Sequence, residues 1–311
     1  MIKKNRITII LVNYNNTNDT IECVKSIQDS KDIELPFIII VDNCSNIKII
    51  SDDFLFYPNL KIIYNKKNIG FGRANNVGIE WVKKNLDFEY LLLLNNDTII
   101  EPETIKALTL PFSKDKSIGI TTSKTYYENN RNIIWYGGGE INYKRGWPKI
   151  TDFNKSASKN GANTSRYVTF ISGCTMMFSR ESIIKLRGFD NNFFMYCEDL
   201  ELCIRAKKNN LNLYYEASSI VYHKVQNSIK DNLGSKISGL KKNNPNLGFL
   251  FYNMKTNQYA TMKKHFKGYD FFIFCLLYWI EFFFKIFYFV LNGRFDMIKV
   301  GLKTIKKNIH E

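Results

Sequence analysis

The sequence predicts an α/β fold in which a mostly parallel central sheet carries helices on both faces. Short runs of β-branched and other apolar residues, typical of buried parallel strands, recur four times in the first third of the chain. Each run passes into a polar loop and then into a helical pattern, an alternation that indicates a parallel sheet with crossover helices. The predicted strands cover residues 7–12, 37–41, 60–64 and 91–94.

Polar residues follow each predicted strand at the same end. Asn13 and Asp42 end two strands, Arg73 follows the third, and Asp97 follows the fourth. The carboxyl ends of parallel strands meet at one edge of a sheet, where open α/β folds bind ligands. We therefore expect these four side chains along one ligand-binding edge. Asp42 either accepts a hydrogen bond from a base or ribose hydroxyl, or is an ordinary turn aspartate.

Asp97 ends the segment YLLLLNNDT, in which four leucines suit a strand buried on both faces. A carboxylate in this position can coordinate a hard divalent cation and leave positions for water and substrate phosphates. The alternative is a capped turn, with Asp97 bonded to the backbone of a helix that starts near Pro102. This segment alone does not decide between the two.

Gly70 and Gly72 resemble a fragment of a dinucleotide-binding loop, but the third glycine is missing and we expect the helix to start later. The interpretation most consistent with the charge of the chain is that these glycines let the backbone approach a ligand. Arg73 would then meet a phosphate.

The second half of the chain contains a further set of candidate residues. Residues 167–179 are strand-like around Gly173, which indicates a bulge or the close approach of a ligand. A helix beginning near Glu198 then carries three carboxylates within four residues, at Glu198, Asp199 and Glu201. They either complement the helix dipole, or include a general base whose pKa is raised by nearby apolar side chains. His223 closes a predicted strand over residues 213–222 and is a candidate metal ligand.

The formal charge of +15 and the isoelectric point of about 9.4 call for an anionic partner. Much of the lysine excess falls late in the chain, which favours a membrane surface, and no nucleic-acid-binding motif is recognisable, so no nucleic-acid partner is expected. The six cysteines contain no CxxC pair and are predicted to be reduced and buried.

Residues 271–291 form an almost unbroken apolar and aromatic stretch, long enough to span a bilayer. Glu281 and Lys285 interrupt it and can pair on one helix face, and lysines flank both ends. These features favour helices that lie in the cytoplasmic leaflet, with residues 298–309 as a basic amphipathic helix. A single transmembrane helix and a helix packed on the rest of the chain are the alternatives.

Seven collinear blocks of this sequence resemble the inverting family-2 glycosyltransferases with the GT-A fold, and within them the rhamnosyltransferase-like branch. A match to any one block is weak evidence for the family, but seven matches in the same order are specific to it. The blocks are VNYNN (12–16), VDNCS (41–45), NIGFGRANN (68–76), LLNNDT (93–98), ISGCTMMF (171–178), GFDNNFFMYCEDLELCIR (188–205) and YH (222–223).

The resemblance implies a role for each matching residue. Asp97 would bind Mg²⁺ or Mn²⁺ as the last residue of the DxD motif, whose first position is Asn95 here, and His223 would complete the metal site. Asp199, with Glu198 beside it, would be the catalytic base. Glu201 stands where aspartate is usual. Donor contacts would come from Asn13, Tyr14, Asn15, Asp42, Asn68, Gly70, Arg73, Asn75 and Asn96, and the acceptor side from Gly173, Cys174 and Glu201.

The resemblance also implies a nucleotide-diphospho-sugar transferase with a catalytic domain over residues 1–230, followed by a membrane-associating region over residues 231–311. The donor would be a dTDP-rhamnose-like or UDP-hexose molecule. The acceptor would be a glycan or a lipid-linked glycan of a bacterial surface polysaccharide, at the cytoplasmic face of the plasma membrane. The alternative is a catalytically inactive membrane-bound scaffold of the same fold, which Asn95 in the metal motif keeps open.

Overall fold

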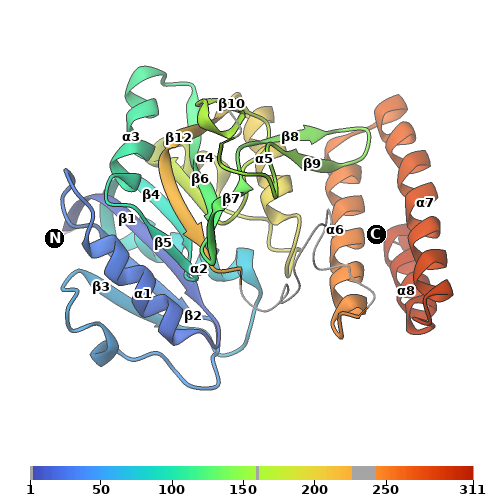
Figure 1. The fold of residues 1–311 in the computed structure, drawn as a ribbon, viewed down its shortest axis with the longest axis horizontal. Helices are drawn as coiled ribbons and strands as arrows, with labels where there is room; N and C mark the ends of the chain where they lie inside the picture. The colour runs from blue at the N-terminus through green and yellow to red at the C-terminus, as the bar shows by residue number, and fades with distance from the viewer. Residues whose placement is uncertain (1–2, 159–160, 226–242, 311) are drawn as a thin grey trace.

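The computed structural model describes residues 3–158, 161–225 and 243–310. Figure 1 shows a twisted sheet flanked by helices, with a group of three C-terminal helices on one side. The strands are β1 (Lys3–Asn13), β2 (Phe37–Asp42), β3 (Leu60–Tyr64), β4 (Leu86–Asn95), β5 (Thr98–Ile100), β6 (Ile118–Tyr127), β7 (Asn130–Tyr136), β8 (Gly139–Asn142), β9 (Trp147–Ile150), β10 (Arg166–Val168), β11 (Thr175–Ser179) and β12 (Asn212–His223). The helices are α1 (Thr17–Gln28), α2 (Phe71–Asn85), α3 (Thr104–Lys114), α4 (Arg180–Leu186), α5 (Glu198–Lys208), α6 (Leu247–His265), α7 (Gly268–Leu291) and α8 (Asp296–His310), with short 3₁₀ turns at Ser51–Phe54 and Gly161–Asn163.

The main sheet has the strand order β10-β12-β6-β11-β4-β1-β2-β3, with β5 and β7 paired to β12 and β6. The first four predicted strands are confirmed as β1 to β4, and they pair in parallel. β11 runs antiparallel to both of its neighbours, β4 and β6, whereas β12 is parallel to β6. The predicted fold class, a mostly parallel sheet within an α/β fold, is therefore confirmed.

Each face of the sheet is covered because adjacent strand residues point to opposite sides. Ile9 lies in an apolar cluster with side chains of α1 and α3. Its neighbour Ile10 lies in a second cluster with side chains of α2, α5 and α6. The apolar runs of the sequence thus form strands buried on both faces, as in other doubly covered sheets.

Two local predictions are wrong. Residues 167–179 are not one strand: β10 and β11 are separate, and Gly173 lies in the connection between them. The helix after the glycine pair does not start late but begins at Phe71, directly after Gly70, whose φ of 88° is open to glycine at little cost.

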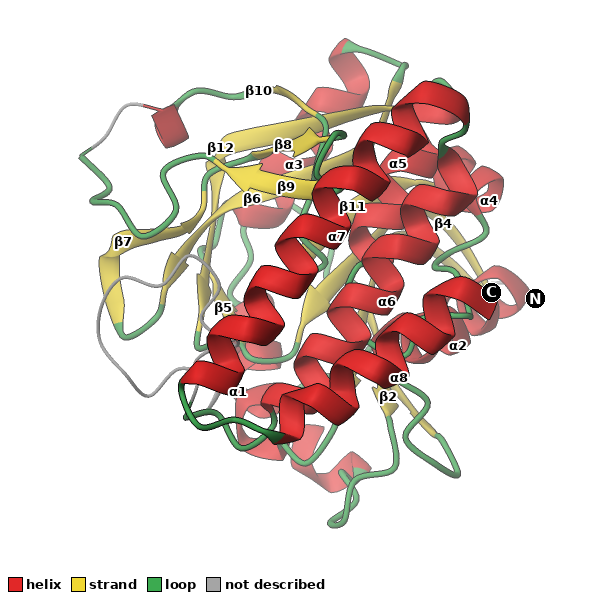
Figure 2. Cartoon of the chain, turned by 90° about the vertical axis from the view of Figure 1, so that its right-hand side faces the viewer, coloured by secondary structure: helices red, strands yellow, loops and turns green. Residues whose placement is uncertain are grey.

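The C-terminal helices pack on the rest of the chain. Leu247 and Phe251 of α6 and Phe274 of α7 belong to the same apolar cluster as Ile10 of the sheet. Figure 2 shows α6, α7 and α8 side by side over this flank of the molecule. The boundary predicted between residues 230 and 231 lies outside the described residues.

All six cysteines are free. Four of them are buried as predicted, but Cys44, on a loop, is exposed, and Cys275 of α7 is only partly buried where it packs against the apolar core. No disulfide therefore contributes to the fold.

Candidate active site

The carboxyl ends of β1, β2 and β4 meet at one edge of the sheet. Asn13 is in register with Asp42 of β2, and Val12 is in register with Asn95 of β4. The buried Asn13 amide donates to Asp42 Oδ2 (3.0 Å) and Ser45 Oγ (3.1 Å). The edge predicted from the sequence is therefore present, and its polar side chains are bonded to one another.

Asp42 is only 1% exposed, and both of its carboxylate oxygens accept bonds within the protein. Oδ1 accepts from the backbone N–H of Ser45 at 2.9 Å, and Oδ2 accepts from Asn13. Asp42 thereby joins the ends of β1 and β2. Tyr14, 47% exposed, offers an accessible aromatic side chain next to this network.

Asn15 and Asn96 extend the same network. Asn15 has a left-handed backbone (φ 55°), and its side-chain oxygen accepts from the backbone N–H of Asn46 at 2.7 Å. The Asn96 amide donates to Thr20 Oγ1 at 2.8 Å and to Asn13 Oδ1 at 3.3 Å. The residue after β4 is thus bonded to the beginning of α1.

The loop before α2 is organised by asparagine side chains. Asn68 Oδ1 accepts from the Gly70 N–H and from the Asn43 amide, both at 2.9 Å. A Cβ on Gly70 would lie 2.0 Å from the carbonyl oxygen of Phe194. Gly70 therefore makes room for the backbone of this chain, and its predicted contact with a ligand stays a prediction. Gly72 likewise faces the Phe189 ring.

Arg73 lies in the first turn of α2, and Asn75 follows just after that turn. The Arg73 guanidinium donates through Nε to the backbone oxygen of Asn191. The buried Asn75 amide donates to the Phe71 carbonyl at 3.1 Å. Both side chains therefore have contacts within the protein, and one of them links α2 to the loop before α5.

Asp97 and His223 are adjacent. His223 is paired with Thr98 through the β12–β5 ladder, and its Nε2 lies 3.1 Å from Asp97 Oδ1. The imidazole is buried, with its edge against the Trp135 ring. Burial on its own would lower the pKa of His223, but the neighbouring Cys174 and Asp97 side chains raise it to about 10.

The Asp97–His223 pair has the donor chemistry that a divalent cation takes, once the imidazole has given up its proton. A carboxylate oxygen and an imidazole nitrogen converge there, and Nδ1 of His223 is buried without a hydrogen-bond partner among the described residues. Over residues 3–158, 161–225 and 243–310, no three His, Cys, Asp or Glu side chains gather closely enough to hold a metal. Mg²⁺ is commonly held by one or two protein ligands, with water and substrate phosphates completing its shell.

Asp199 and Glu198 begin α5, as predicted. The half-buried Asp199 carboxylate accepts from the backbone N–H groups of Gly173 (3.2 Å) and Leu200 (2.8 Å). Burial raises the pKa of Asp199, and these two hydrogen bonds only partly oppose it. Burial and the adjacent Asp199 charge also raise the pKa of Glu198, whose Oε2 has no hydrogen-bond partner within the described part of the chain.

A short connection links the two acidic positions. Gly173 donates to Asp199, and the next residue, Cys174, is within hydrogen-bonding reach of His223, which contacts Asp97. The Cys174 carbonyl also accepts from the N–H of Asn95 at the end of β4. Asp97 and Asp199 are therefore connected through the segment that leads into β11, and their sharing of one active site stays a prediction.

Glu201 has different surroundings from the two carboxylates before it. It is fully buried and accepts from Arg205 through two nitrogens, from Lys264 (2.7 Å) and from His265 (3.0 Å). Burial alone would raise the pKa of Glu201, but these partners hold it well below its usual range. Its placement on the acceptor side gains no support from these contacts, because Glu201 joins α5 to the end of α6.

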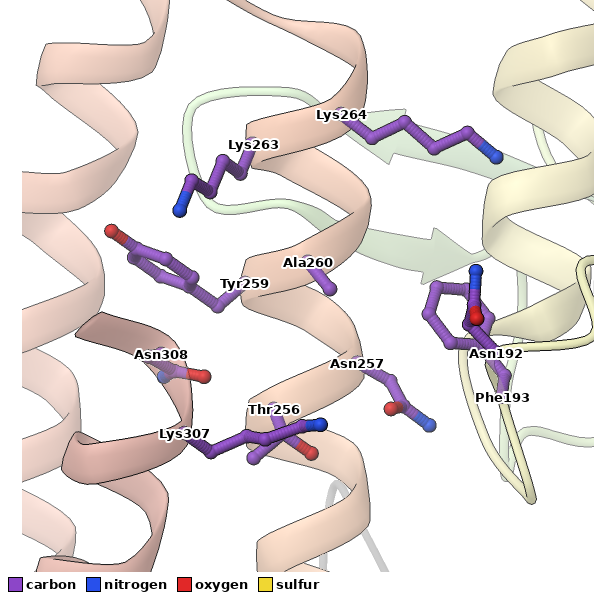
Figure 3. Close-up of a pocket in the computed structure, with 10 residues that line it drawn as sticks. All are labelled: Asn192, Phe193, Thr256, Asn257, Tyr259, Ala260, Lys263, Lys264, Lys307 and Asn308. Carbon is purple, nitrogen blue, oxygen red and sulfur yellow. The ribbon is translucent and has the colours of Figure 1, made fainter. Parts of the chain in front are cut away.

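The loop before α5 has an unusual backbone that α6 supports. Tyr196 and Cys197 both have left-handed φ values (68° and 65°), which cost free energy in residues other than glycine. The Asn257 amide of α6 donates to the carbonyls of Met195 and Tyr196, each at 2.9 Å. Figure 3 shows Asn257 directed toward this loop, at the edge of a cavity of about 460 Å³.

Several residues of the site were missed from the sequence. Asn43 accepts from the Asn65 amide and the Ile69 N–H, Thr20 bonds both Asn13 and Asn96, and Trp135 packs on His223. The VDNCS block contains Asn43 and could have singled it out. Nothing near Trp135 in the sequence indicates that it would reach a residue at the end of β12.

The fold and the acidic edge define the class, a nucleotide-diphospho-sugar transferase fold of the GT-A type. Two solved structures share this fold. The first is GalNAc-T7 with UDP, GalNAc and Mn²⁺, with a TM-score of 0.58, 18% identity, and coverage of 80% of this chain and 48% of that one. The second is residues 1–349 of Staphylococcus aureus TarS, with a TM-score of 0.54, 16% identity, and coverage of 87% and 70%.

The chain belongs to glycosyl transferase family 2, because the model of that family matches residues 8–187, more than half of the chain. The model of a second family, described as the N-terminal domain of galactosyltransferase, matches residues 154–226. The first of these matches confirms the family that the seven sequence blocks indicated.

Curated relatives support the rhamnosyltransferase-like branch. Rhamnosyltransferase WbbL of Escherichia coli K12 is 25% identical over 175 residues, 52% of this chain and 62% of the relative. The N-acetylglucosaminyl-diphospho-decaprenol L-rhamnosyltransferase of Mycobacterium tuberculosis is 24% identical over 196 residues, 56% and 62%. The low-salt glycan biosynthesis hexosyltransferase Agl10 of Haloferax volcanii is 28% identical over 212 residues, 67% and 63%. The chain thus matches little more than three fifths of the length of these relatives.

Proposed function

We propose that this chain is a metal-dependent, inverting glycosyltransferase. It would move a sugar from a nucleotide-diphospho-sugar to a hydroxyl group of a glycan or lipid-linked glycan in the synthesis of a bacterial surface polysaccharide. The proposal is supported by the family, by relatives named as rhamnosyltransferases and a hexosyltransferase, and by the site around Asp97 and Asp199. A dTDP-rhamnose-like or UDP-hexose donor is proposed on the same grounds.

The observation that carries the proposal is the setting of Asp199. Its carboxylate is half-buried, its pKa is raised by burial, and two backbone N–H groups fix its orientation. A carboxylate of raised pKa is a better proton acceptor near neutral pH than an exposed aspartate. Asp199 would accept the proton of the acceptor hydroxyl while that oxygen bonds to the anomeric carbon. The bond from that carbon to the diphosphate breaks on the opposite side, so the configuration inverts.

Asp97 and His223 would hold a Mg²⁺ or Mn²⁺ ion together with the donor diphosphate. When bound, the ion stabilises the negative charge of the departing diphosphate. Asn13, Asp42 and Asn96 would fix the edge of the sheet against which the nucleoside lies, and the exposed Tyr14 ring would offer it a stacking surface. This chemistry requires no covalent enzyme intermediate.

The experiment that tests the proposal is Asp199→Asn, assayed with a panel of nucleotide sugars and Mn²⁺. Turnover should fall by about a hundredfold to ten-thousandfold, the range for loss of a general base. Donor binding by calorimetry should be retained, since Asp199 is not assigned to the donor. The matched control is Glu181→Gln, which changes an exposed first-turn carboxylate of α4 and should leave turnover unchanged.

Three outcomes would contradict the proposal. Unchanged turnover in Asp199→Asn would remove Asp199 from the mechanism. A wild-type chain that binds nucleotide sugars but turns none of them over with Mn²⁺ would favour the inactive scaffold. Retention of the anomeric configuration in the product, seen by NMR, would exclude the inverting mechanism.

A further inference from the structure

One face of α7 is apolar and exposed. Large side chains recur on it at intervals of three or four residues, so they lie on one side of the helix. They include Phe272 (62% exposed), Ile280 (61%), Phe283 (56%), Phe284 (70%), Phe287 (62%) and Leu291 (69%). Contiguous apolar surfaces of this kind mark interaction sites.

The exposed surface continues onto α8. Ile298, Leu302 and Ile309 are 46%, 63% and 65% exposed, and Phe295 (67%) lies between the two helices. We call these residues, together with the exposed side chains of α7, the α7–α8 face. Lys299, Lys303 and Lys306 are also exposed on α8, so apolar and basic groups alternate along that helix.

The opposite side of α7 is packed along most of its length. Phe274, Tyr278, Phe282 and Phe289 are all buried, and they share one apolar cluster with α6 and the sheet. Glu281, near the middle of α7, contacts Lys255 of α6 (3.1 Å) and Lys285 (2.6 Å). A purely lipid-surrounded α7 would have to break the contact with Lys255 and leave this apolar cluster.

α6 is in turn held to the catalytic part of the chain. Lys264 and His265 contact Glu201 of α5, and Asn257 bonds the loop before α5. If α7 crossed a bilayer in this arrangement, the polar groups of α6 would enter the hydrocarbon, which holds no water to solvate them. α7 is long and apolar enough to cross a membrane, but its packing leaves only one side for lipid.

The border of the α7–α8 face is basic. Lys299, Lys303 and Lys306 are exposed beside the apolar side chains of α8, and the exposed Lys263 lines the cavity between α6, α8 and the Asn192 loop (Figure 3). Such a border complements the phosphates of anionic lipids. A second copy of the chain seated on this face would instead bring lysines against lysines.

We propose that the α7–α8 face docks onto an anionic membrane surface with α7 in the plane of the membrane and not across it. The apolar side chains enter the boundary between headgroups and acyl chains, and the lysines contact lipid phosphates. The catalytic site and the C-terminus then remain on the same side of the membrane. This proposal does not depend on sugar transfer, because its test measures binding alone.

The first experiment is sedimentation of the full chain with vesicles of equal parts phosphatidylglycerol and phosphatidylcholine. Changing Phe283, Phe284 and Phe287 together to Ser should lower partitioning by about tenfold or more, since three exposed aromatic side chains no longer enter the lipid. The matched control changes Ile47, Ile50 and Leu55 to Ser. These three residues are also exposed but lie far from α7 in the sequence, so the control should leave partitioning unchanged. Circular dichroism checks that both variants remain folded.

A second pair of variants tests the charge. Changing Lys299 and Lys306 to Glu should lower binding by about tenfold, whereas changing Lys61 and Lys116 to Glu should have a much smaller effect. Pure phosphatidylcholine vesicles should bind more weakly than the mixed vesicles. Equal binding of wild type and the triple Ser variant would overturn the proposal, as would a dimer in solution that the triple variant abolishes while vesicle binding is absent.

A third measurement tests the orientation. A chain with a C-terminal epitope is added to sealed vesicles, which are then treated with protease. The in-plane arrangement predicts that the epitope is digested at the same rate with and without detergent. An epitope protected until detergent is added would show that α7 crosses the bilayer and would overturn the proposed orientation.

Discussion

The carboxylate groups on the first turn of α5 have opposite surroundings. Asp199 and Glu198 are covered by apolar groups and backbone, contact no cationic side chain in the described part of the chain, and have raised pKa values. Glu201, two residues later, is bonded to Arg205, Lys264 and His265, and its pKa is lowered. The same residue class on the same helix therefore has two different electrostatic states.

This difference in surroundings separates a carboxylate with a proposed catalytic role from one that stabilises the fold. The charge of Glu201 is compensated by its own helix and by α6, so its burial stabilises the junction of the two helices. The charges of Glu198 and Asp199 are not compensated in this way, and an ionised carboxylate in such a place destabilises the fold. Uncompensated charges of this kind gather at functional sites. The contrast supports Asp199, and not Glu201, as the catalytic group.

The largest stability effect is expected for Glu201→Gln. Loss of the charge leaves Arg205, Lys264 and His265 without their shared partner, and breaking a buried ion pair costs about 3–5 kcal/mol. Urea denaturation measures the change in the free energy of unfolding. The matched control is Glu80→Gln, which breaks an exposed pair with Lys83 and should cost less than about 1 kcal/mol. Equal losses in the two variants would mean that Glu201 is not a structural anchor.

The next largest effect is expected in Mn²⁺ binding at Asp97 and His223. His223→Ala should raise the Mn²⁺ concentration needed for half-maximal binding by at least about tenfold, because it removes one of the two proposed protein ligands. Calorimetric titration with Mn²⁺ measures this without any donor. His310→Ala, at the exposed end of α8, is the control. Unaltered Mn²⁺ affinity in His223→Ala would leave Asp97 without its predicted partner.

A smaller effect of opposite sign is expected for Glu198→Gln. Replacing the buried, uncompensated carboxylate by a neutral group of the same shape should stabilise the fold by about 1–2 kcal/mol at neutral pH. The thermal midpoint should therefore rise, whereas it falls in Glu201→Gln. A lower midpoint in Glu198→Gln would indicate that another group compensates the Glu198 charge.

The smallest effects are in the pH dependence of stability. The folded-state pKa of Glu201 is depressed, so its contribution is fully present above its ordinary value of 4.5 and is lost as the pH falls below it. The folded-state pKa of Glu198 is raised, so it makes the fold less stable as the pH rises above 4.5. Denaturation at a series of pH values should show a shallower loss of stability below pH 4.5 in Glu201→Gln, and a shallower loss between pH 4.5 and about 8 in Glu198→Gln. Profiles identical to wild type would contradict both assignments.

The sequence predicted the parts of the fold that depend on local pattern. Apolar runs indicated β1 to β4, and the pattern of apolar residues after Tyr196 indicated a helix with the carboxylates at 198 and 199 in its first turn, which is α5. The helical spacing at the C-terminus likewise indicated the exposed apolar side chains of α8. In each case, the periodicity of the apolar residues and the polar residues at the ends of the elements carry the information.

Features set by distant contacts were not predictable. Gly70 fits against Phe194, and the hydrogen-bond partners of Glu201 include two residues of α6 more than sixty positions away. The antiparallel pairing of β11 and the separation of β10 from β11 are also set by long-range pairing. Three carboxylates close together in the sequence do not show which of them will have cationic side chains packed against it in the fold.

The most direct test of this account measures turnover and stability together in Asp199→Asn and Glu201→Gln. We predict that Asp199→Asn loses turnover by at least about a hundredfold and keeps or gains stability. Glu201→Gln should lose several kcal/mol of stability, with turnover at a temperature where it is folded reduced far less. If both variants lose stability and turnover in parallel, the two carboxylates do not have the separate roles that their surroundings indicate.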